Sequence, residues 1–398
     1  MSKGLYIGVS NVARKAKKAY VGVNNVARKV KKVYIGVNAV ARLAWSGAFL
    51  SKYTGAVSPL TEVKWNACSA SNGTYAIFAG GIYSYYYGDT TYYTMRTSVD
   101  AYNSSLVKTV APALTYGRDS SNGKNGARVG QYAYFGLGEN FNGYSVNYAN
   151  AYNQALVRVD FEDIIPTIQQ SVQQNDLNNP TYAICGYGFY NNGTSPYNPQ
   201  GQHYGINSSL VKSYFYDNAV LRSLVGVACV GGQVLIAGGD DQPLTMYSND
   251  TDLKDIVSAF NSSYVKTSLS VLSSKRGVVK GICNNNYALF VGGRGAGNNP
   301  VSTIDVYNSS LVKLTPLDFG NAEAGEFNYA QSPEFALTPA VAKSYDDIVY
   351  GFDTSLVRTV AGTSSIIHPR GATVGDYIVF GGFKGAVNYD TVDVFKTT

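Results

Sequence analysis

Few residues in this 398-residue chain have the chemistry of a catalytic or metal-binding group. His203 and His368 are its only histidines, and 165 positions separate them. A copper centre needs at least two imidazoles on one ion, and a Ser-His-Asp triad would have to use one of these two residues. The sequence also has no GxSxG turn, P-loop or dinucleotide-binding glycine motif. We therefore expect no enzyme activity and no cofactor, and we interpret both histidines as surface or turn residues.

Cysteine and aspartate offer two further metal candidates. The cysteines Cys68, Cys185, Cys229 and Cys283 are not in CxxC spacing, and the last two each lie nine residues before a Gly-Gly pair. Equivalent positions in separate repeats should not meet, which predicts buried free thiols and no metal site. Five aspartates could bind calcium, although they lack the glycine of an EF-hand loop. They are Asp240, Asp241, Asp250, Asp252 and Asp255.

Tyrosine is the contact-forming residue that this chain has in excess, with 34 copies. Three segments, 82–97, 139–148 and 189–205, combine it with Ser, Gly and Asn. Antibody binding loops use this mixture, because Tyr supplies rigid amphipathic contact area while the small polar residues adapt. The same segments could instead pack against a neighbouring subunit. The candidate receptor-binding residues are the tyrosines Tyr83, Tyr85, Tyr86, Tyr87, Tyr92, Tyr93, Tyr144, Tyr148, Tyr190 and Tyr197.

A repeated phrase reveals the elements that must position these segments. STIDVYNSSLVKLTPL (302–317) has six further versions, and the turn residues of neighbouring versions are 43 to 54 positions apart. A period of about 40–50 residues with strand signals predicts a β-propeller with one blade per repeat. We therefore expect an all-β fold with seven blades over residues 46–398. The aligned turn residues are Asn103, Asn153, Asn207, Asn261, Asn308, Asp353 and Lys396.

The fifth repeat predicts four strands per blade, A to D, at 277–283, 287–293, 302–308 and 311–317. The Asn-rich turns between them suit tight hairpins because Asn tolerates positive φ, and the Gly pair ends strand B where neighbouring blades crowd. Since strands alternate in direction, the B–C and D–A connections emerge on one face, and the Tyr-rich segments are B–C connections of blades one to three.

Two repeats depart from this pattern. The sixth has only EFALTPA (334–340) in place of its strand B, which indicates a degenerate blade. The last repeat stops after its strand C, while residues 50–60 match a strand D with no A, B or C before it. We expect residues 50–60 to complete the seventh blade and close the ring, which removes both sheet edges.

The stretch HPRGATVGDYIVFGG (368–382), followed by VDVF (392–395), resembles a kelch repeat, and Arg276 and Arg222 lie near the equivalent of Arg370. The resemblance covers about residues 60–398, but Leu or Tyr of SSLVK or SSYVK replaces the Trp that usually closes a kelch repeat. It implies a propeller, and it leaves two alternatives to a binding protein: a carbohydrate-active enzyme and an intracellular scaffold.

Residues 1–45 form a basic head, with ten Lys or Arg and no acid, whereas residues 46–398 carry 22 basic and 26 acidic groups. Three copies of a 14-residue unit, marked by Gly8, Gly22 and Gly36, predict a small β-meander or the start of a β-solenoid. About 45 residues bury too little to fold alone, so we interpret the head as a docking module. Its aromatics are not interleaved with Arg as in nucleic-acid binders. The candidate docking residues are Arg14, Lys17, Lys18, Arg28, Lys31 and Lys32.

The head, on GVNNVARKVKK (22–32) and its copies, is similar to N-terminal repeats of tail or baseplate-associated proteins from phages of Gram-positive bacteria. This resemblance implies a virion structural and adhesion protein that docks onto other tail proteins, forms a homo-oligomer in the particle and contacts a host-surface glycan or protein. The sequence start has no signal-peptide pattern and no stretch approaches about 20 apolar residues, so we expect synthesis in the host cytoplasm without membrane insertion.

Overall fold

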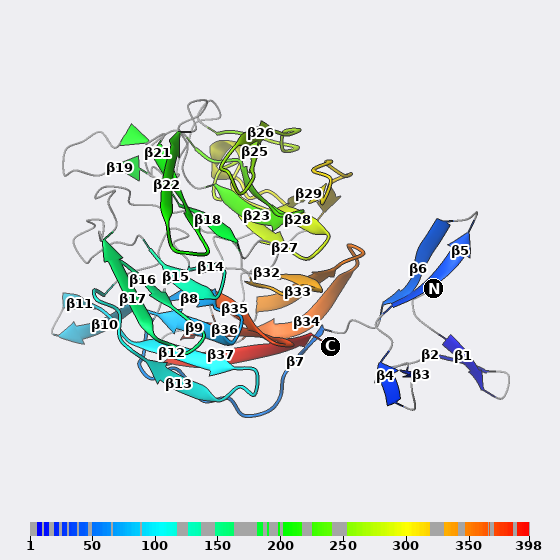
Figure 1. Cartoon of the computed structure of the whole chain (residues 1–398), viewed down its shortest axis with the longest axis horizontal. Coiled ribbons are helices and arrows are strands. Elements are labelled where there is room, and N and C mark those ends of the chain that lie inside the picture. The colour runs from blue at the N-terminus through cyan, green and yellow to red at the C-terminus, as the bar shows by residue number, and fades with distance from the viewer. Residues whose placement is uncertain are drawn as a thin grey trace.

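The computed structural model consists almost entirely of β-strands, arranged as sheets around a common centre with three hairpins outside them (Figure 1). Within 6–46 and 84–92, the backbone alone is described for those residues that the structure describes. No helix in the described part of the chain is long and apolar enough to cross a membrane. The structure describes residues 6–9, 12–15, 20–23, 26–29, 32–37, 40–46, 50–64, 67–87, 90–117, 126–136, 148–162, 181–185, 189–190, 198–199, 202–216, 225–240, 253–318, 330–340, 347–364, 366, 370–384 and 388–397.

Seven antiparallel sheets form the blades, and the prediction of an all-β, seven-bladed propeller is confirmed. The sixth blade is a complete four-stranded sheet despite its degenerate sequence, and three strands of the third blade lie among the described residues. In chain order the blades contain β8 (Cys68–Ser71), β9 (Tyr75–Ala79), β12 (Val99–Asn103) and β13 (Lys108–Ala111); β14 (Ala127–Val129), β15 (Tyr132–Phe135), β16 (Tyr148–Tyr152) and β17 (Arg158–Glu162); β18 (Tyr182–Cys185), β21 (Gln202–Asn207) and β22 (Lys212–Tyr216); β23 (Gly226–Val230), β24 (Gln233–Ala237), β25 (Val257–Phe260) and β26 (Lys266–Ser268); β27 (Lys280–Cys283), β28 (Tyr287–Val291), β29 (Thr303–Asn308) and β30 (Leu317–Asp318); β31 (Ala330–Gln331), β32 (Phe335–Ala340), β33 (Asp347–Asp353) and β34 (Arg358–Ser364); and β35 (Arg370–Val374), β36 (Tyr377–Lys384), β37 (Asn388–Thr397) and β7 (Leu50–Lys52).

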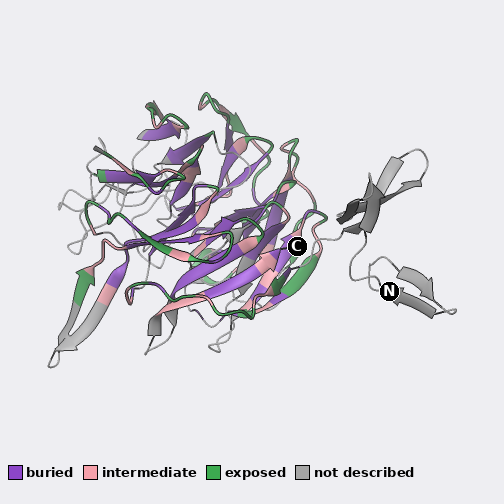
Figure 2. Ribbon diagram, turned by 60° about the horizontal axis from the view of Figure 1, so that its bottom comes forward, coloured by how far each residue is buried: buried purple, intermediate pink, exposed green. Residues whose placement is uncertain are grey.

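The core lies between the faces of neighbouring blades. Strands such as β9, β23 and β28 are almost wholly buried, as nearly continuous apolar strands with sheets on both sides should be (Figure 2). Innermost strands of successive blades touch, and β35 of the last blade touches β8 of the first. Each blade therefore buries its two faces only because both of its neighbours are in place.

The last blade takes its outer strand from the other end of the propeller sequence. Lys52 of β7 pairs with Phe395 of β37, and the amide of Tyr53 donates to the carbonyl oxygen of Val394 at 2.8 Å. Further along the same segment, Leu50 and Leu60 are buried in two of the hydrophobic clusters. The segment from Leu50 to Leu60 thus links the two ends of the propeller by backbone pairing and by burial.

A recurrent turn joins the third and fourth strands of six blades. In the first blade, Oδ1 of Asn103 accepts hydrogen bonds from the amides of Ser105 at 2.9 Å and Val107 at 3.0 Å. Asp353 accepts the same two bonds in the sixth blade. The expectation that Asn supplies the positive φ of this turn is wrong, because φ is positive at the residue three positions later. These residues, with φ of 59 to 62°, are Leu106, Leu156, Leu210, Tyr264, Leu311 and Leu356.

This left-handed leucine has a packing role. A residue with a Cβ atom pays about 1–2 kcal/mol in the left-handed region, so something must hold it there. Leu106 lies in one buried cluster with Leu60 of the preceding blade's segment, and Leu156 lies in another with Leu114. The side-chain cap of the turn and this burial together hold the conformation, and the leucine fills space between neighbouring blades.

Tyrosines of the third strands and cations of the fourth strands hold consecutive carbonyl groups of the preceding blade. The hydroxyl of Tyr102 donates to the Ser58 oxygen at 2.9 Å, and Lys108 Nζ donates to the Pro59 oxygen at 2.8 Å. In the second blade Tyr152 and Arg158 hold the oxygens of Pro112, at 2.7 Å, and Ala113. In the fifth blade the donors are Tyr307 and Lys313, and the acceptors are Ser270 at 2.6 Å and Val271 at 2.7 Å. We name these contacts the carbonyl grips.

The glycine pairs at the ends of the second strands lie where a Cβ atom would clash, as predicted, and their φ angles are positive as well. Gly238 has a φ of +66° and Gly293 a φ of +101°. A Cβ atom on Gly238 would lie 2.7 Å from the Arg276 oxygen, and one on Gly293 would lie 2.6 Å from the Gly277 oxygen. Both backbone conformation and close approach therefore exclude a side chain there.

The basic head contains three separate two-stranded hairpins, so the expectation of a continuous meander or solenoid is wrong. They are β1–β2, β3–β4 and β5–β6, with equivalent glycines paired to Ala13, Ala27 and Ala41. Two residues separate the strands of each hairpin. A lone two-stranded hairpin is marginally stable in water, which favours a role in which the head binds something else. The elements are β1 (Tyr6–Val9), β2 (Val12–Lys15), β3 (Tyr20–Val23), β4 (Val26–Lys29), β5 (Lys32–Val37) and β6 (Val40–Ser46).

Ring closure predicts that two N-terminal truncations behave differently. Deleting residues 1–60 removes β7 and two buried leucines, and large-to-small loss of such a side chain costs about 2–5 kcal/mol each. We expect a thermal unfolding midpoint well below that of the full chain. Deleting residues 1–45 should leave the midpoint unchanged. Equal midpoints for the two truncations, measured by circular dichroism, would contradict a structural role of this segment in closing the ring.

The turn analysis predicts an asymmetry between two substitutions at Asn103. Asn103→Ala removes the acceptor of two amides and should lower the free energy of unfolding by about 1–2 kcal/mol. Asn103→Asp should cost less, because Asp353 already serves the same turn. Urea unfolding of both variants checks this, and the interpretation fails if the alanine variant is as stable as the aspartate variant.

Candidate functional site

The candidate site lies on the face that carries the B–C and D–A connections, at the junction of blades 1 and 2. The sequence predicts an irregular loop for the first Tyr-rich segment. The segment is instead a hairpin of β10 (Ile82–Tyr87) and β11 (Thr90–Met95). It pairs Tyr83 with Thr94 and Tyr85 with Tyr92. Alternating aromatic and β-branched residues suit a paired ribbon, which sequence reasoning overlooked.

Contacts at the base of this hairpin fix it to the blade. The Arg96 amide donates to the Gly81 oxygen at 2.8 Å, and the Arg96 Nε atom lies 3.1 Å from Glu62 Oε2. The guanidinium carbon of Arg96 also lies 4.7 Å from the centre of the Tyr83 ring. Arg96 thus joins the end of β11 to the start of β10 and to the D–A connection that carries Glu62.

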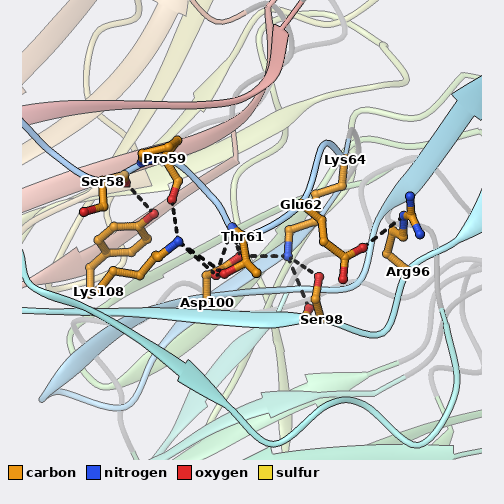
Figure 3. A network of polar contacts seen from close by, with 10 residues as sticks. Ser58, Pro59, Thr61, Glu62, Lys64, Arg96, Ser98, Asp100 and Lys108 are labelled. Atoms are coloured by element: carbon orange, nitrogen blue, oxygen red, sulfur yellow. Dashed lines mark hydrogen bonds and ion pairs between the residues drawn. The ribbon is translucent and has the colours of Figure 1, made fainter.

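Beneath the hairpin, a buried carboxylate organises the D–A connection (Figure 3). Asp100, in the third strand of blade 1, accepts the amide of Thr61 at 3.1 Å and also its hydroxyl group. Lys64 Nζ lies 3.1 Å from the same carboxylate and donates to the Ser98 oxygen at 3.2 Å. Lys108 approaches the carboxylate to 4.0 Å from the other side. Segment 58–64 is therefore bound to the blade at several points.

Burial sets the electrostatics of this network. The side chains of Lys64 and Asp100 are both fully buried, and burial lowers the pKa of Lys64 while the attraction of Asp100 opposes that shift. Burial, reinforced by Asp100, raises the pKa of Tyr102 well above its usual value, so its hydroxyl keeps the proton that it donates to Ser58. Groups this deeply buried cannot meet a ligand, and they act by holding the surface above them in place.

The fifth blade repeats the arrangement. Asp305 accepts the amide of Ser273 at 3.0 Å and pairs with the buried Arg276 and with Lys313 at 2.9 Å. Burial lowers the pKa of Arg276, and the charge of Asp305 opposes this effect. A carboxylate on the third strand, a hydroxyl residue in the D–A connection and a cation three positions after it form one recurring device.

Two exposed tyrosines, Tyr116 and Tyr148, meet between blades 1 and 2, and a third, Tyr93, lies on the β10–β11 hairpin beside them. Tyr93 is 43% exposed, Tyr116 is 48% exposed and Tyr148 is 37% exposed. The rings of Tyr116 and Tyr148 lie 4.7 Å apart, centre to centre, at an angle of 31°. Gly117, next to Tyr116, approaches Met95 of the hairpin so closely that a Cβ would lie 2.7 Å from the Met95 Cβ. We name Tyr93, Tyr116 and Tyr148 the tyrosine patch.

Polar residues below the patch hold its central pair. The fully buried Asn150 accepts the Thr115 amide at 3.3 Å and donates to the Thr115 hydroxyl at 2.8 Å. It also donates to Asp160 Oδ1 at 2.7 Å, and Asp160 pairs with Arg158 at 2.8 Å. Thr115 precedes Tyr116 directly, and Asn150 lies two positions after Tyr148 on the same strand. The network therefore fixes the backbone that carries both rings.

The other predicted receptor-binding residues lie either in paired strands or outside the described residues. Tyr85, Tyr86, Tyr87 and Tyr92 lie in the hairpin strands, where the backbone alone is described. Tyr190 lies in β19 (Phe189–Tyr190), which pairs with β20 (Asn198–Pro199), while Tyr144 and Tyr197 lie outside the described residues. Among the docking residues, Arg14, Arg28 and Lys32 lie in strands of the head, and Lys17, Lys18 and Lys31 lie outside the described residues.

Sequence reasoning missed Tyr116, Arg96 and Glu62. Tyr116 belongs to a D–A connection, and the Tyr-rich segments are B–C connections, although strand alternation places both kinds on the same face. Its position in the connection after the fourth strand is the available signal. The roles of Arg96 and Glu62 depend on an approach between residues 34 positions apart that no local pattern reveals.

The metal and thiol candidates can be placed in part. Interpreting His203 as a surface residue is wrong: it is 1% exposed, because it already belongs to β21, where it pairs with Phe215. His368 lies outside the described residues. Cys68, Cys229 and Cys283 are buried free thiols, as predicted. Among described residues no three His, Cys, Asp or Glu side chains form a metal-binding group, and Asp241, Asp250 and Asp252 lie outside them.

Comparison with known proteins adds little beyond the fold. No protein-family model matches the sequence. No curated protein matches it either. Among solved structures, the one titled "Structure of YjhT" is similar over 86% of this chain and 96% of its own, with 11% sequence identity and a TM-score of 0.47. That similarity is too low to support an argument on function, and the seven-bladed fold is shown by the sheets themselves.

The buried network predicts different costs for two lysines around one carboxylate. Lys64→Met leaves Asp100 without its fully buried partner and should lower the free energy of unfolding by about 3–5 kcal/mol. Lys108→Met removes a partly exposed partner 4.0 Å from Asp100 together with the hydrogen bond to the Pro59 oxygen, and should cost about 1–2 kcal/mol. Urea unfolding of the two variants measures both values. A smaller loss for Lys64→Met than for Lys108→Met would show that the pair does not hold the D–A connection.

Proposed function

We propose that this protein is a non-enzymatic structural and adhesion protein of a phage tail or baseplate, which contacts the host surface through the face between blades 1 and 2. The observation that carries the proposal is the tyrosine patch: Tyr116 and Tyr148 are in ring contact, Tyr93 lies on the hairpin that approaches Gly117, and all three are at least 37% exposed. Aromatic side chains are enriched at protein interfaces, and they supply much of the binding energy of those interfaces. In this protein they are presented on a surface whose backbone is already fixed.

Preorganisation supports a binding role. Ordering flexible groups on binding costs free energy, and a surface that is ordered beforehand avoids this cost. The Asp100 network, the Arg96 contacts and the Asn150 contacts each hold one of the segments that carry the patch. Among the described residues, the charged groups Arg96, Glu62, Arg158 and Asp160 around the patch are paired within these networks, which favours contact with a ligand over catalysis.

The remaining parts of the proposal rest on the sequence. The kelch type is supported by the buried Arg276, one of the arginines near the equivalent of Arg370, while the Leu or Tyr that replaces the closing Trp departs from the kelch pattern. The basic hairpins of the head dock onto other tail proteins, and the protein forms a homo-oligomer in the particle, is made in the host cytoplasm and binds neither nucleic acid nor membrane. The intracellular scaffold and the carbohydrate-active enzyme remain the competing hypotheses.

The proposal predicts a loss of adhesion without a loss of stability. The triple variant Tyr93→Ala, Tyr116→Ala and Tyr148→Ala should keep the wild-type melting temperature, because all three side chains are exposed. Its affinity for cell walls of the host should fall by about 30-fold or more, as expected if even one is an anchor worth about 2 kcal/mol. Tyr214→Ala is the matched control, since Tyr214 is 41% exposed on the outer strand of blade 3.

Sedimentation of the purified protein with cell walls measures this affinity. If the triple variant and Tyr214→Ala bind as tightly as the wild type, the patch is not the adhesion surface. If adhesion is unchanged while particles carrying the triple variant fail to assemble, the tyrosines pack between subunits, and the packing interpretation replaces the recognition one.

A further inference from the structure

The chemistry of the tyrosine patch points to one class of ligand. We propose that the patch binds carbohydrate, with Tyr116 and Tyr148 as the platform on which a sugar ring lies. This inference rests on the proposed adhesion function and specifies its ligand. Its first support is geometric: the two rings lie 4.7 Å apart, centre to centre, at an angle of 31°, so they stack on one another, and both side chains are exposed. The outer face of this stack is the flat apolar surface on which a sugar ring can lie.

A sugar ring matches such a platform because its two faces differ from its edge. The C–H bonds of a pyranose face pack on an aromatic ring, while its hydroxyl groups point outward and need hydrogen-bond partners. Tyrosine has the same division, with an apolar body and a polar tip. A pair of tyrosines can therefore contact a sugar face without leaving its hydroxyl groups unpaired against apolar surface.

Two polar side chains beside Asn150, on the strand next to that of Tyr148, are suitable partners. Asp160 has 44% of its side chain exposed and Arg158 has 30%, and they pair with one another at 2.8 Å beside Asn150. A carboxylate accepts hydrogen bonds from sugar hydroxyl groups, and a guanidinium donates to them. Because Asn150 holds Asp160 at 2.7 Å and Arg158 donates to the Ala113 oxygen, both side chains are oriented before a ligand arrives.

The distribution of exposed apolar side chains disfavours a protein ligand at this place. Among the described residues, the large exposed apolar side chains at this junction of the face are tyrosines, whereas exposed valines lie elsewhere, mainly on the fourth strands and their turns. Val107, Val157 and Val312, for example, directly follow the left-handed leucine of the turn. A protein interface core would be expected to present aliphatic or Met side chains among its aromatics. The patch instead presents hydroxyl-bearing rings only.

Chemical treatment of the target surface tests the ligand class with the wild-type protein. Host cell walls are divided into three samples: untreated, oxidised with periodate, which cleaves the vicinal diols of sugars, and digested with a broad protease. Binding is measured by sedimentation of the full-length protein. We expect periodate to lower binding at least tenfold and protease to leave it unchanged. Because these samples need no variant, the test holds even if a substitution disturbs folding.

The double variant Tyr116→Ala with Tyr148→Ala locates the site. It should lose about 30-fold in affinity for untreated walls, while Tyr214→Ala keeps wild-type affinity. Binding that survives periodate but is lost after protease would overturn the carbohydrate inference and leave the adhesion proposal standing. Periodate-sensitive binding that the double variant retains would overturn the assignment to this platform. Absence of binding to untreated walls would overturn both proposals.

Discussion

The structure depends on how each blade holds the one before it. In blades 1, 2 and 5 a tyrosine of the third strand and a cation six residues after it hold two consecutive carbonyl oxygens past the outer strand of the preceding blade. A backbone carbonyl that leaves a sheet has lost its ladder partner and needs another one. The carbonyl grips supply that partner and tie neighbouring blades together in the same step. Since every blade needs a neighbour on each side, the ring gains its full stability only when it is closed.

Closure explains why the two ends of the propeller sequence meet. β7 adds to β37, and the segment after β7 provides the Ser58 and Pro59 oxygens that Tyr102 and Lys108 hold. The same short segment continues to Thr61 and Lys64, which bind Asp100. Strand pairing, the carbonyl grip and the buried ion pair thus act in sequence along 50–64. Through Glu62 and Arg96 their effect reaches the hairpin that bears Tyr93.

Much of the architecture could be predicted from the sequence, because the repeat places equivalent residues at equivalent positions. The number of blades, the strand order and the face that carries the Tyr-rich segments all follow from periodicity and strand alternation. What the sequence concealed depended on approach in space. Turn chemistry suggested that Asn103 would take the positive φ, yet its side chain caps the turn and Leu106 takes it, because burial between blades offsets the strain.

The candidate site shows the same limit more sharply. Composition points to Tyr93 and Tyr148, but Tyr116 lies in the connection between β13 and β14, which has no compositional signal, and only the fold brings its ring to 4.7 Å from that of Tyr148. The composition of 82–95 hides a hairpin, because its tyrosines suggest adaptable contact more strongly than they suggest strands. His203 follows a Gly- and Pro-rich segment, so its place at the start of a buried strand was hidden by its neighbours.

The central claim is that a preorganised face between blades 1 and 2 meets the host surface. Hydrogen–deuterium exchange of the full-length protein, with and without host cell-wall fragments, tests it most directly because it locates contact without any substitution. The account predicts slower exchange in 93–97, 114–117 and 148–150, with the turns at Asn103, Asn153 and Asn308 unchanged. Slower exchange at those turns or in the head alone, with none in the three segments, would contradict it.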